Sequence, residues 1–519
     1  MEQLETQVLI VGGGPVGLAL AAELGSRGVA TMLLEKRDGA VGTPKMNLVN
    51  VRTMEHCRRW GIAQAVRDAG LPADYPHDVV FTRTLAAPEI GRLSRPSKRA
   101  QHCGPNSPET YQQCSQLWFD PILRDFVSTL PEVQLRYRHV LVDFVEHADG
   151  VTARVRNERT GIDVVCRARY LVGCDGADST VRDRLGIGQR GNGVLSRSLN
   201  GFFESDAFLR SHDKGPAVRY FFADSGGLWG NIVAIDGVKL WRFALTRVPE
   251  AEDLSTQELD ARLQAAVGRK FHYRWVGVMP WLRRELVAER YGNDKVFLAG
   301  DAAHQLSPTG GFGMNTGIGD AVDLGWKLPA VLRGWGGARL LESYEAERKP
   351  IGERNLAQAT GNFRLWVTPM GQLGDGLVDA LRREFETEGV QLGYRYDGSP
   401  ICVPDGTPNP PDDPMRYAPT SRPGSRAPHG WLDDGRSTLD LFGQGFVLLR
   451  FAHAIPVERL ASAFAIRKVP LQVFDIPDVG IARLYEAPMA LIRPDGHVAW
   501  RAGALPSDCM ALVDTVRGA

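Results

Sequence analysis

Residues 6–35 read TQVLIVGGGPVGLALAAELGSRGVATMLLE, and this stretch decides the fold. Residues 8–11 are continuously apolar, which is typical of a strand buried on both faces of a sheet. An Ala- and Leu-rich segment up to residue 24 predicts a helix, and residues 29–34 predict a second strand. Strand, helix and strand in this order form the first unit of a dinucleotide-binding domain.

Three glycines, Gly12, Gly14 and Gly17, stand in G-x-G-x-x-G spacing between the first strand and the helix. Gly12 permits the tight turn, Gly14 lets a pyrophosphate approach the backbone, and Gly17 lets the helix pack against the strand. The helix N-terminus at Pro15 supplies free N–H groups and a positive dipole end for the phosphates. Glu35 ends the second strand, where it accepts hydrogen bonds from ribose hydroxyls and disfavours a 2′-phosphate. The pattern predicts dinucleotide binding but leaves FAD and NAD open.

Bulk properties exclude several classes of protein. A chain of 519 residues is too long for one core, so two to four domains are expected. Lys+Arg and Asp+Glu both count 61, so no net field favours nucleic acid or an anionic membrane. The chain begins MEQLETQ, which has no signal-peptide pattern, and no apolar stretch is long enough to span a membrane. Seven cysteines without a C-x-x-C pair favour reduced thiols in the cytoplasm and no metal site.

Two further segments place glycine and an acid after a buried strand. They are Cys174-Asp175-Gly176 and Gly300-Asp301. Ligands of open α/β sheets lie beyond the carboxyl ends of the strands, so three such ends predict one elongated ligand. Asp301 is then placed to bind a ribityl hydroxyl. The alternative is that Asp175 and Asp301 are turn or N-cap acids.

The segment after Asp301 is rich in glycine. Glycines 310, 311, 313 and 317 let a loop pass close to a flavin ring. A helix from about Met314 points its positive end at the ring and stabilises the anionic reduced flavin. His304 is a candidate base beside this loop, but we expect it to satisfy a backbone group.

Residues 199–280 contain long strands rich in Phe, Tyr and Trp, interrupted by one helix at 255–267. This pattern predicts a separate sheet with one face lining something apolar. Alternation places three pairs of side chains on shared faces: Tyr220 with Phe222, Trp229 with Asn231, and Trp241 with Phe243. Each is a candidate for a substrate pocket, and the alternative for each is plain core packing.

Several motifs carry a resemblance to a known family. They are GGGPVG at 12–17, CDGADSTVR at 174–182, AGDAAHQLSPTGGFGMNTGIGDAVDLGWKL at 299–328, RPGSRAPHGWL at 422–432, STLDLFGQGFVLL at 437–449 and IRPDGHVAW at 492–500. The chain resembles class A flavoprotein aromatic hydroxylases of the para-hydroxybenzoate hydroxylase fold. Within that class it is most similar to the phenol hydroxylase-like group with a C-terminal thioredoxin-like domain.

The resemblance implies an α/β fold: a Rossmann-type FAD-binding domain, an inserted substrate domain with a mixed or antiparallel sheet, and a thioredoxin-like domain. The FAD-binding domain is expected in three segments, at 1–76, 106–190 and 286–395, the last of which includes long helices. The substrate domain is expected to take strands from 77–105 and its main body from 191–285. A Pro-rich linker at 396–428 then leads to the thioredoxin-like domain at 429–519. Because this last domain lacks C-x-x-C, we assign it no redox role.

The resemblance also implies a reaction. NADH or NADPH reduces FAD, and O2 gives a C4a-hydroperoxyflavin that transfers OH to a substituted phenol or related hydroxyaromatic. The alternatives are a Baeyer–Villiger-type or polyketide-tailoring oxygenase on the same fold, and a flavin-binding protein without turnover. The intact Gly300-Asp301 pair and glycine run argue against the last. The expected partner is a small aromatic molecule, and monomer and homodimer both stay open.

The resemblance carries site residues over one by one. On the cofactor side they are Glu35, Lys36, Lys45, Gln116, Arg124, Asp175, Asp301, Pro308, Gly311, Gly313, Met314 and Asn315, in addition to the first glycine motif. On the substrate side the resemblance gives Asn47 and Pro308 (by the peroxide position), and the strand alternation described above adds Tyr220, Trp229 and Asn231. Two positions depart from the family. Many relatives carry Arg where Lys45 stands, and phenol hydroxylases tend to carry an acid at Asn47, which as an amide cannot act as a general base.

Overall fold

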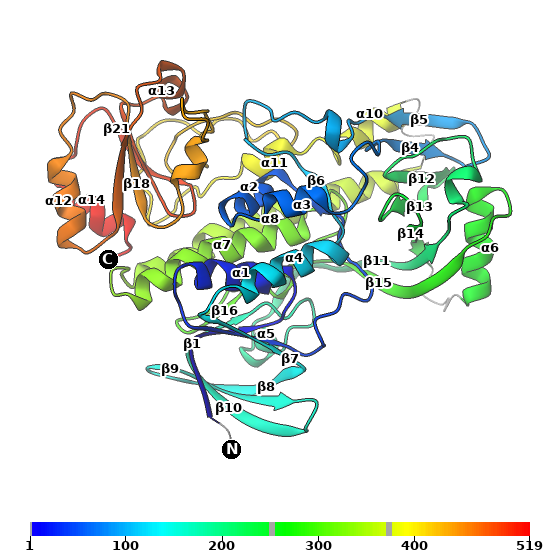
Figure 1. Ribbon diagram of the computed structural model, residues 1–519, viewed down its shortest axis with the longest axis horizontal. Coiled ribbons are helices and arrows are strands. Elements are labelled where there is room, and N and C mark those ends of the chain that lie inside the picture. The colour runs from blue at the N-terminus through cyan, green and yellow to red at the C-terminus, as the bar shows by residue number, and fades with distance from the viewer. Residues whose placement is uncertain (1–2, 249–254, 370–375) are drawn as a thin grey trace.

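The computed structural model describes residues 3–248, 255–369 and 376–519, and Figure 1 shows three lobes around two long helices. Helices α7 (Gly313–Leu332) and α8 (Arg339–Trp366) cross the middle of the molecule. The dinucleotide-binding sheet lies below them, an eight-stranded sheet lies on the right, and the C-terminal domain lies on the left. This arrangement confirms the predicted fold class.

The first sheet has seven strands, in the order β7-β2-β1-β10-β9-β8, with β16 also paired to β10. Its strands are β7 Val133–Tyr137, β2 Thr31–Glu35, β1 Gln3–Val11, β10 Ile162–Gly173, β16 Val296–Leu298, β9 Gly150–Asn157 and β8 His139–His147. Strands β7, β2, β1, β10 and β16 run parallel, and β8 and β9 form an antiparallel arm. Residues 8–11 of β1 are buried, as a strand covered on both faces requires.

Three helices pack near this sheet: α1 (Pro15–Ser26), α4 (Gln116–Ser128) and α7. Helix α1 contacts both α4 and α7. The short helix α5 (Thr180–Arg184) follows β10. The βαβ unit predicted from residues 6–35 is therefore present, and strands β1, β10 and β16 end side by side below α7.

The eight-stranded sheet has the order β17-β15-β11-β14-β13-β12-β4-β5. Its strands are β17 His304–Gln305, β15 Arg274–Ala288, β11 Gln189–Glu204, β14 Leu240–Val248, β13 Gly227–Ala234, β12 Arg219–Asp224, β4 Val79–Thr82 and β5 Glu89–Leu93. Helix α6 (Thr256–Val267) covers one face, where Leu259 and Leu263 join the aromatic core. The other face turns toward the C-terminal end of α8, because Phe221 of β12 lies edge-on to Trp366 of α8 at 5.1 Å.

The C-terminal domain has a four-stranded sheet of order β19-β18-β20-β21. Its elements are β18 Phe446–Arg450, α12 Glu458–Ile466, β19 Leu471–Asp475, α13 Val479–Tyr485, β20 Met489–Ile492, β21 Val498–Ala502 and α14 Cys509–Val516. Strands β18 and β19 are parallel and joined through α12, and β20 and β21 form an antiparallel hairpin. This is the thioredoxin-like arrangement that the tail motifs predict.

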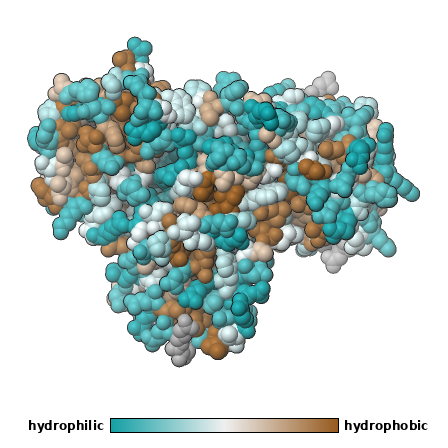
Figure 2. All heavy atoms as spheres, viewed as in Figure 1, coloured by the Kyte–Doolittle hydropathy of each residue, from teal (hydrophilic) through white to brown (hydrophobic). Residues whose placement is uncertain are grey.

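The remaining elements connect the lobes. They are β3 Leu48–Val49, α2 Val51–Arg59, α3 Ala63–Asp68, β6 Gln112–Gln113, α10 Leu377–Arg382 and α11 Glu388–Leu392. Between residues 400 and 428 nine prolines keep the chain extended as it runs to the C-terminal domain. Figure 2 shows hydrophilic residues over most of one face, with apolar residues in small groups between them. No helix among the described residues has the length and apolar character needed to cross a membrane.

Candidate flavin and substrate site

Three loops meet beyond the parallel strands. The backbone N–H of Gly12 donates to Leu34 O (2.8 Å), that of Cys174 donates to Val11 O (2.8 Å), and that of Ala299 donates to Gly173 O (2.9 Å). A Cβ on Gly12, whose φ is +111°, would lie 2.3 Å from Cys174 O. The loops after β1, β10 and β16 therefore lie against one another, as the convergence of the three acid-bearing segments requires.

The glycine loop is packed tightly against the protein at Gly12 and Gly17, but it has open space at Gly14. A Cβ on Gly17 would lie 2.0 Å from Gly12 O, so only glycine lets α1 approach the loop. Gly14 and Gly313 differ, because a Cβ on either would meet nothing within 4 Å. Gly14 is also the N-cap of α1 and gives no side-chain cap. Open backbone at the starts of α1 and α7, with uncapped N–H groups, fits the phosphates and ring of a flavin dinucleotide.

Glu35 lies at the edge of the same loop. Its Oε2 accepts a hydrogen bond from Gly13 N and its Oε1 accepts one from Arg37 N, both at 2.8 Å. Nearby, Gln116 Nε2 donates to Asp120 Oδ2 at 2.8 Å, while Asp120 Oδ1 has no partner in the described chain. Burial raises the pKa of Asp120 to about 7. Asp120 was not predicted, although the i,i+4 spacing from Gln116 in a helix could have indicated it.

Of the predicted basic residues, Lys45 is the one whose charge acts on Asp301, although its side chain is exposed. Its backbone N–H donates to Gln116 Oε1 at 2.9 Å, and its ammonium lies 5.7 Å from the ring centre of Trp281. Arg124 pairs with its neighbour Asp125 at the surface (3.1 Å), and Lys36 is exposed. The structure therefore brings Lys45 and Gln116 together and leaves Lys36 and Arg124 at the rim, where their role stays a prediction.

The two aspartates after β10 and β16 have different surroundings. Asp175 accepts hydrogen bonds from Ser179 Oγ (2.6 Å) and Val181 N (3.1 Å), so its carboxylate helps to cap α5. This matches the turn or N-cap alternative. Asp301 accepts no hydrogen bond from the residues that the structure describes, although burial raises its pKa against the opposing charges of His304 and Lys45. A half-buried carboxylate without a donor fits a ribityl hydroxyl.

The flavin loop, residues 306–315, is shaped by Gly310 and Gly311, whose φ angles are +89° and +69°. Asn315 then ties the first turn of α7 to the segment before α2. Its Oδ1 accepts hydrogen bonds from Asn50 N (3.0 Å) and Thr53 Oγ1 (2.7 Å), and its Nδ2 donates to Gly311 O (2.7 Å). The side chain of Asn315 is thus used within the protein. What it can offer a flavin is the backbone beside Gly313 and Met314, while Pro308 is exposed at the start of the loop.

The expectation for His304 was wrong. The ring Nε2 lies 2.7 Å from Asp320 Oδ2, and both side chains are fully buried. A carboxylate on α7, not a backbone group, is its partner, because α7 packs directly on the Gly300–Asp301 turn. Asp320 also accepts a hydrogen bond from Gly300 N at 3.0 Å. Asp320 therefore fixes the turn that carries Asp301.

The predicted shared face of Trp229 and Asn231 is corrected by a β-bulge. The register between β12 and β13 shifts after Phe222, which makes Trp229 the extra residue. Its ring stacks on Phe222 at 5.3 Å and lies 6.4 Å from Phe243. Tyr220 lies on that same face, is fully buried, and donates its hydroxyl to Gly215 O at 2.6 Å. Both aromatics belong to the core on the side of α6, so the structure does not place them with the flavin loop.

Asn231 lies on the opposite face, which looks toward α8. Its cross-strand neighbour is Phe221, whose ring contacts Trp366 of α8. Its Oδ1 is buried and has no hydrogen-bond partner in the described chain, and the same holds for both polar side-chain atoms of Asn47. Buried polar atoms without partners are rare in folded proteins, so these two amides are candidates to contact a ligand.

Three arginines on this side of the sheet were not predicted. Arg219 and Arg242 both lie beside Val233 in the strand register and so share a face with Asn231. Burial lowers the pKa of Arg242 to about 9, and its Nε has no partner in the described chain. Burial lowers the pKa of Arg283 to about 10. Arginines that alternate with the aromatic residues of VRYFFAD and VKLWRFALT were the available signal.

This arginine-bearing face reaches the flavin loop. Arg283 Nη1 donates to Ser307 Oγ at 2.7 Å, and its guanidinium lies 4.3 Å from the ring centre of Phe363. Glu384 is the one carboxylate that the described residues offer here. It accepts from Arg219 Nη1 (3.3 Å) and from Trp366 Nε1 (2.5 Å). Burial raises its pKa, and the opposing effects include Arg219 and the backbone of Gly310.

Known proteins resemble the whole chain. Residues 5–359 match the FAD binding domain family, and residues 420–518 match the C-terminal domain family of aromatic-ring hydroxylases. The tetracenomycin B2 monooxygenase-dioxygenase of Streptomyces olivaceus is 34% identical over 99% of this chain and 98% of its own length. The 4-methyl-5-nitrocatechol 5-monooxygenase of a Burkholderia species is 33% identical over 99% of this chain and 97% of its own.

Solved structures agree. RebC, a rebeccamycin biosynthetic enzyme solved with reduced flavin, is 38% identical with a TM-score of 0.92, each chain being fully covered. A second RebC structure, with bound 7-carboxy-K252c, is 37% identical at the same TM-score and coverage. The glycine cradle, the free Asp301 carboxylate and these matches lead to one conclusion. The chain belongs to the FAD-dependent aromatic-ring hydroxylases, which are flavoprotein monooxygenases.

Proposed function

We propose that this enzyme hydroxylates the ring of a hydroxyaromatic substrate that carries an acidic group, with FAD, NADH or NADPH, and O2. The observation that carries the proposal is the charge on the face opposite α6. Arg219, Arg242 and Arg283 lie there with Glu384 as the one described carboxylate. Arg242 is half-buried, and no ion pair or hydrogen bond to its side chain is found within the described chain. A partly desolvated charge without a partner is costly, so an anionic ligand group is the expected partner of Arg242.

The acidic group has support from a relative. The RebC structure with 7-carboxy-K252c shows that an enzyme 37% identical to this one accommodates a carboxylated aromatic. A guanidinium suits this task because its planar fork binds a carboxylate through two parallel hydrogen bonds. Arg242, whose pKa remains near 9, is protonated at neutral pH and able to bind it.

The names of the relatives indicate substrates of two sizes. One relative is named for a nitrocatechol, which is a single phenolic ring, and another for tetracenomycin B2. Phe221, Phe363 and Trp366 line the same side of the sheet as the arginines and offer flat apolar surface. We favour a polycyclic hydroxyaromatic of the polyketide-tailoring type, because three arginines and three aromatic rings exceed what one phenol needs. A simple substituted phenol is the second candidate.

The residues of the chain then have separate tasks. The uncapped start of α1 binds the pyrophosphate, Glu35 the adenosine ribose, and Asp301 a ribityl hydroxyl. When bound, FAD supplies the chemistry that activates O2. Asn47, with both polar side-chain atoms unpartnered in the described chain, orients a substrate hydroxyl but cannot take its proton, since an amide is no general base.

A substrate screen tests the proposal. NADH and NADPH oxidation would be followed with a panel of mono- and polycyclic hydroxyaromatics, each with and without a carboxyl group, and the products would be identified by mass spectrometry. We expect hydroxylated product from a carboxylated member of the panel. Hydroxylation that is equally fast with the matched uncarboxylated compounds would contradict the acidic-group proposal.

Asn47→Leu is expected to uncouple NAD(P)H oxidation from hydroxylation. The leucine cannot hold the substrate hydroxyl, so the ring is misplaced and activated oxygen decays to hydrogen peroxide. The ratio of product to NAD(P)H consumed should fall severalfold while FAD content is unchanged. Asn47→Asp adds a carboxylate that can accept the phenol proton, so it should shift the pH profile of single-turnover hydroxylation. If both variants keep the coupling and pH profile of the wild type, Asn47 is structural.

A further inference from the structure

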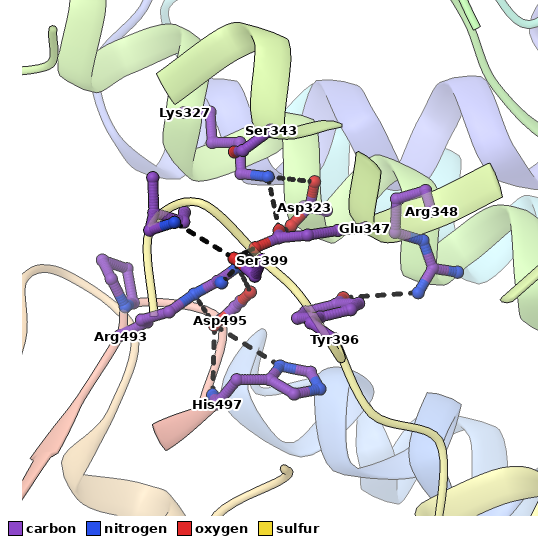
Figure 3. Close-up of polar contacts among 12 residues, drawn as sticks. Asp323, Lys327, Ser343, Glu347, Arg348, Tyr396, Ser399, Arg493, Asp495 and His497 are labelled. Atoms are coloured by element: carbon purple, nitrogen blue, oxygen red, sulfur yellow. Dashed lines mark hydrogen bonds and ion pairs between the residues drawn. The ribbon is translucent and has the colours of Figure 1, made fainter. Parts of the chain in front are cut away.

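A fully buried network of charges joins the C-terminal domain to helices α7 and α8 (Figure 3). Arg493, in the turn after β20, has no exposed side-chain surface. Its Nη1 donates to Glu347 Oε1 of α8 (2.5 Å), and its Nη2 donates to Asp323 Oδ1 of α7 (3.2 Å). It also pairs with Asp495 of its own turn. One guanidinium thus contacts three carboxylates from three elements.

The network contains more acid than base. Lys327 Nζ donates to Asp323 Oδ2 (2.7 Å) and Glu347 Oε2 (2.6 Å), which makes two cations for three carboxylates. Burial, together with the neighbouring carboxylates of Glu347 and Asp495, raises the pKa of Asp323 to about 8. Ser399, from the Pro-rich segment, adds a hydrogen bond to Glu347 Oε1. Removal of one partner from such a buried network leaves an uncompensated charge, which strains the elements that carry it.

The network continues from α8 to the first turn of α7 and to the turn that carries Asp301. Arg348, next to Glu347, donates its Nε to Asp320 Oδ1 (2.9 Å) and its Nη2 to Thr316 O in the first turn of α7 (3.0 Å). Asp320 in turn accepts the hydrogen bond from Gly300 N that fixes the Asp301 turn. Arg493 is therefore connected, through the adjacent residues Glu347 and Arg348 of α8, to the first turn of α7 and to the Asp301 turn.

The C-terminal domain also contacts α2, which lies on the other side of the first turn of α7. Arg52 of α2 donates to Asp495 O of the C-terminal domain at 2.9 Å, and Arg426, at the end of the Pro-rich segment that leads into this domain, forms an ion pair with Glu55 of α2. The start of α2 holds the Asn315 side chain through Asn50 and Thr53. All of these side chains are buried. Both helices that flank the first turn of α7 are thus anchored in the C-terminal domain.

We infer that the C-terminal domain positions the flavin site, and that Arg493 sets the placement of α7 and of the Asp301 turn. The inference rests on the proposed FAD site at these elements. It gives the domain a task that needs no redox cysteines, in agreement with its lack of C-x-x-C. Arg493 is a positioning residue and contacts no cofactor atom itself.

The affinity for FAD, measured by titration of apoprotein, tests the inference against a purely structural role. The variant is Arg493→Met, and the matched control is Arg501→Met. Arg501 lies in the same domain, is 8% exposed in its side chain, and pairs with Asp405 and Glu486 without contacting α7 or α8. We expect Arg493→Met to raise the Kd for FAD at least tenfold. Arg501→Met should change it less than twofold, even where the two variants lose similar thermal stability.

A milder pair keeps the test decisive if Arg493→Met does not fold. Ser399→Ala removes the hydrogen bond to Glu347 Oε1 and the one that Ser399 accepts from Ile401 N, without a change of charge. The control, Ser421→Ala, also removes two hydrogen bonds of a buried serine in the same segment, one to Tyr485 O and one from Arg501 Nη1. Ser399→Ala should raise the Kd for FAD about threefold, and Ser421→Ala should leave it unchanged. An unchanged Kd in Ser399→Ala and in any folded Arg493 variant overturns the inference. A wild-type protein that binds no FAD would instead refute the proposed function.

Discussion

Asp301→Ala is expected to lower the affinity of the protein for FAD by about ten- to a hundredfold. The Asp301 carboxylate has no donor among the described residues, and burial raises its pKa, so its hydrogen bond is available to a ligand. A hydrogen bond to a charged group contributes about 1.5–3 kcal/mol, and each 1.4 kcal/mol is tenfold in affinity. Fluorescence titration of apoprotein with FAD would measure the change.

Two control variants test whether the loss of FAD affinity comes from the Asp301 carboxylate. Asp301→Asn keeps an acceptor of the same shape without the charge, so its loss should be smaller than that of the alanine variant. Asp178 lies in the neighbouring loop, is exposed, and pairs with Arg284 at 2.8 Å, so Asp178→Ala should leave FAD affinity unchanged. Wild-type affinity in Asp301→Ala would show that this aspartate is only a turn acid.

Arg242→Met should lower kcat/KM for an acidic substrate by about thirtyfold or more. Truncation of one partner of a buried charge pair costs about 2–5 kcal/mol, because the other charge is left unpaired. The loss should disappear with the matched substrate that lacks the acidic group, since nothing then requires the guanidinium. Steady-state kinetics with the two substrates would separate these effects.

The control for Arg242 is Arg274→Met. Arg274 lies on β15 of the same sheet but is exposed, and it pairs with Glu204. It should keep wild-type kinetics with both substrates. An equal loss of kcat/KM in Arg242→Met with the acidic and the neutral substrate would mean that Arg242 supports the sheet and does not bind the substrate.

The cofactor side of the site was largely predictable because it depends on local patterns. The strand at 8–11, the glycines of α1 and the acid after β16 each follow from neighbouring residues. The structure places this strand inside the sheet, and the glycines and the acid together beyond the carboxyl ends of the strands. Lys36 and Arg124 were carried over by resemblance alone. Nothing in their own neighbourhoods indicated that they would lie at the surface.

The substrate side was not predictable in the same way, because it depends on how strands pair. One bulge after Phe222 moves Trp229 to the other face of the sheet, and strict alternation cannot reveal a bulge. Nothing next to Arg242 in the sequence indicates that its side chain lacks an ion-pair partner in the folded protein. The partners of His304 and Arg493 come from distant segments, so only the folded chain brings them together.

The most direct measurement of the central claim is the incorporation of ¹⁸O from ¹⁸O2 into an aromatic product. Enzyme loaded with FAD and supplied with NADH or NADPH should transfer one ¹⁸O atom to the ring of an acidic hydroxyaromatic. The product mass should rise by that of a single labelled oxygen, and H2¹⁸O should give no label. Consumption of NAD(P)H with hydrogen peroxide as the sole oxygen product, across the whole substrate panel, would contradict the account.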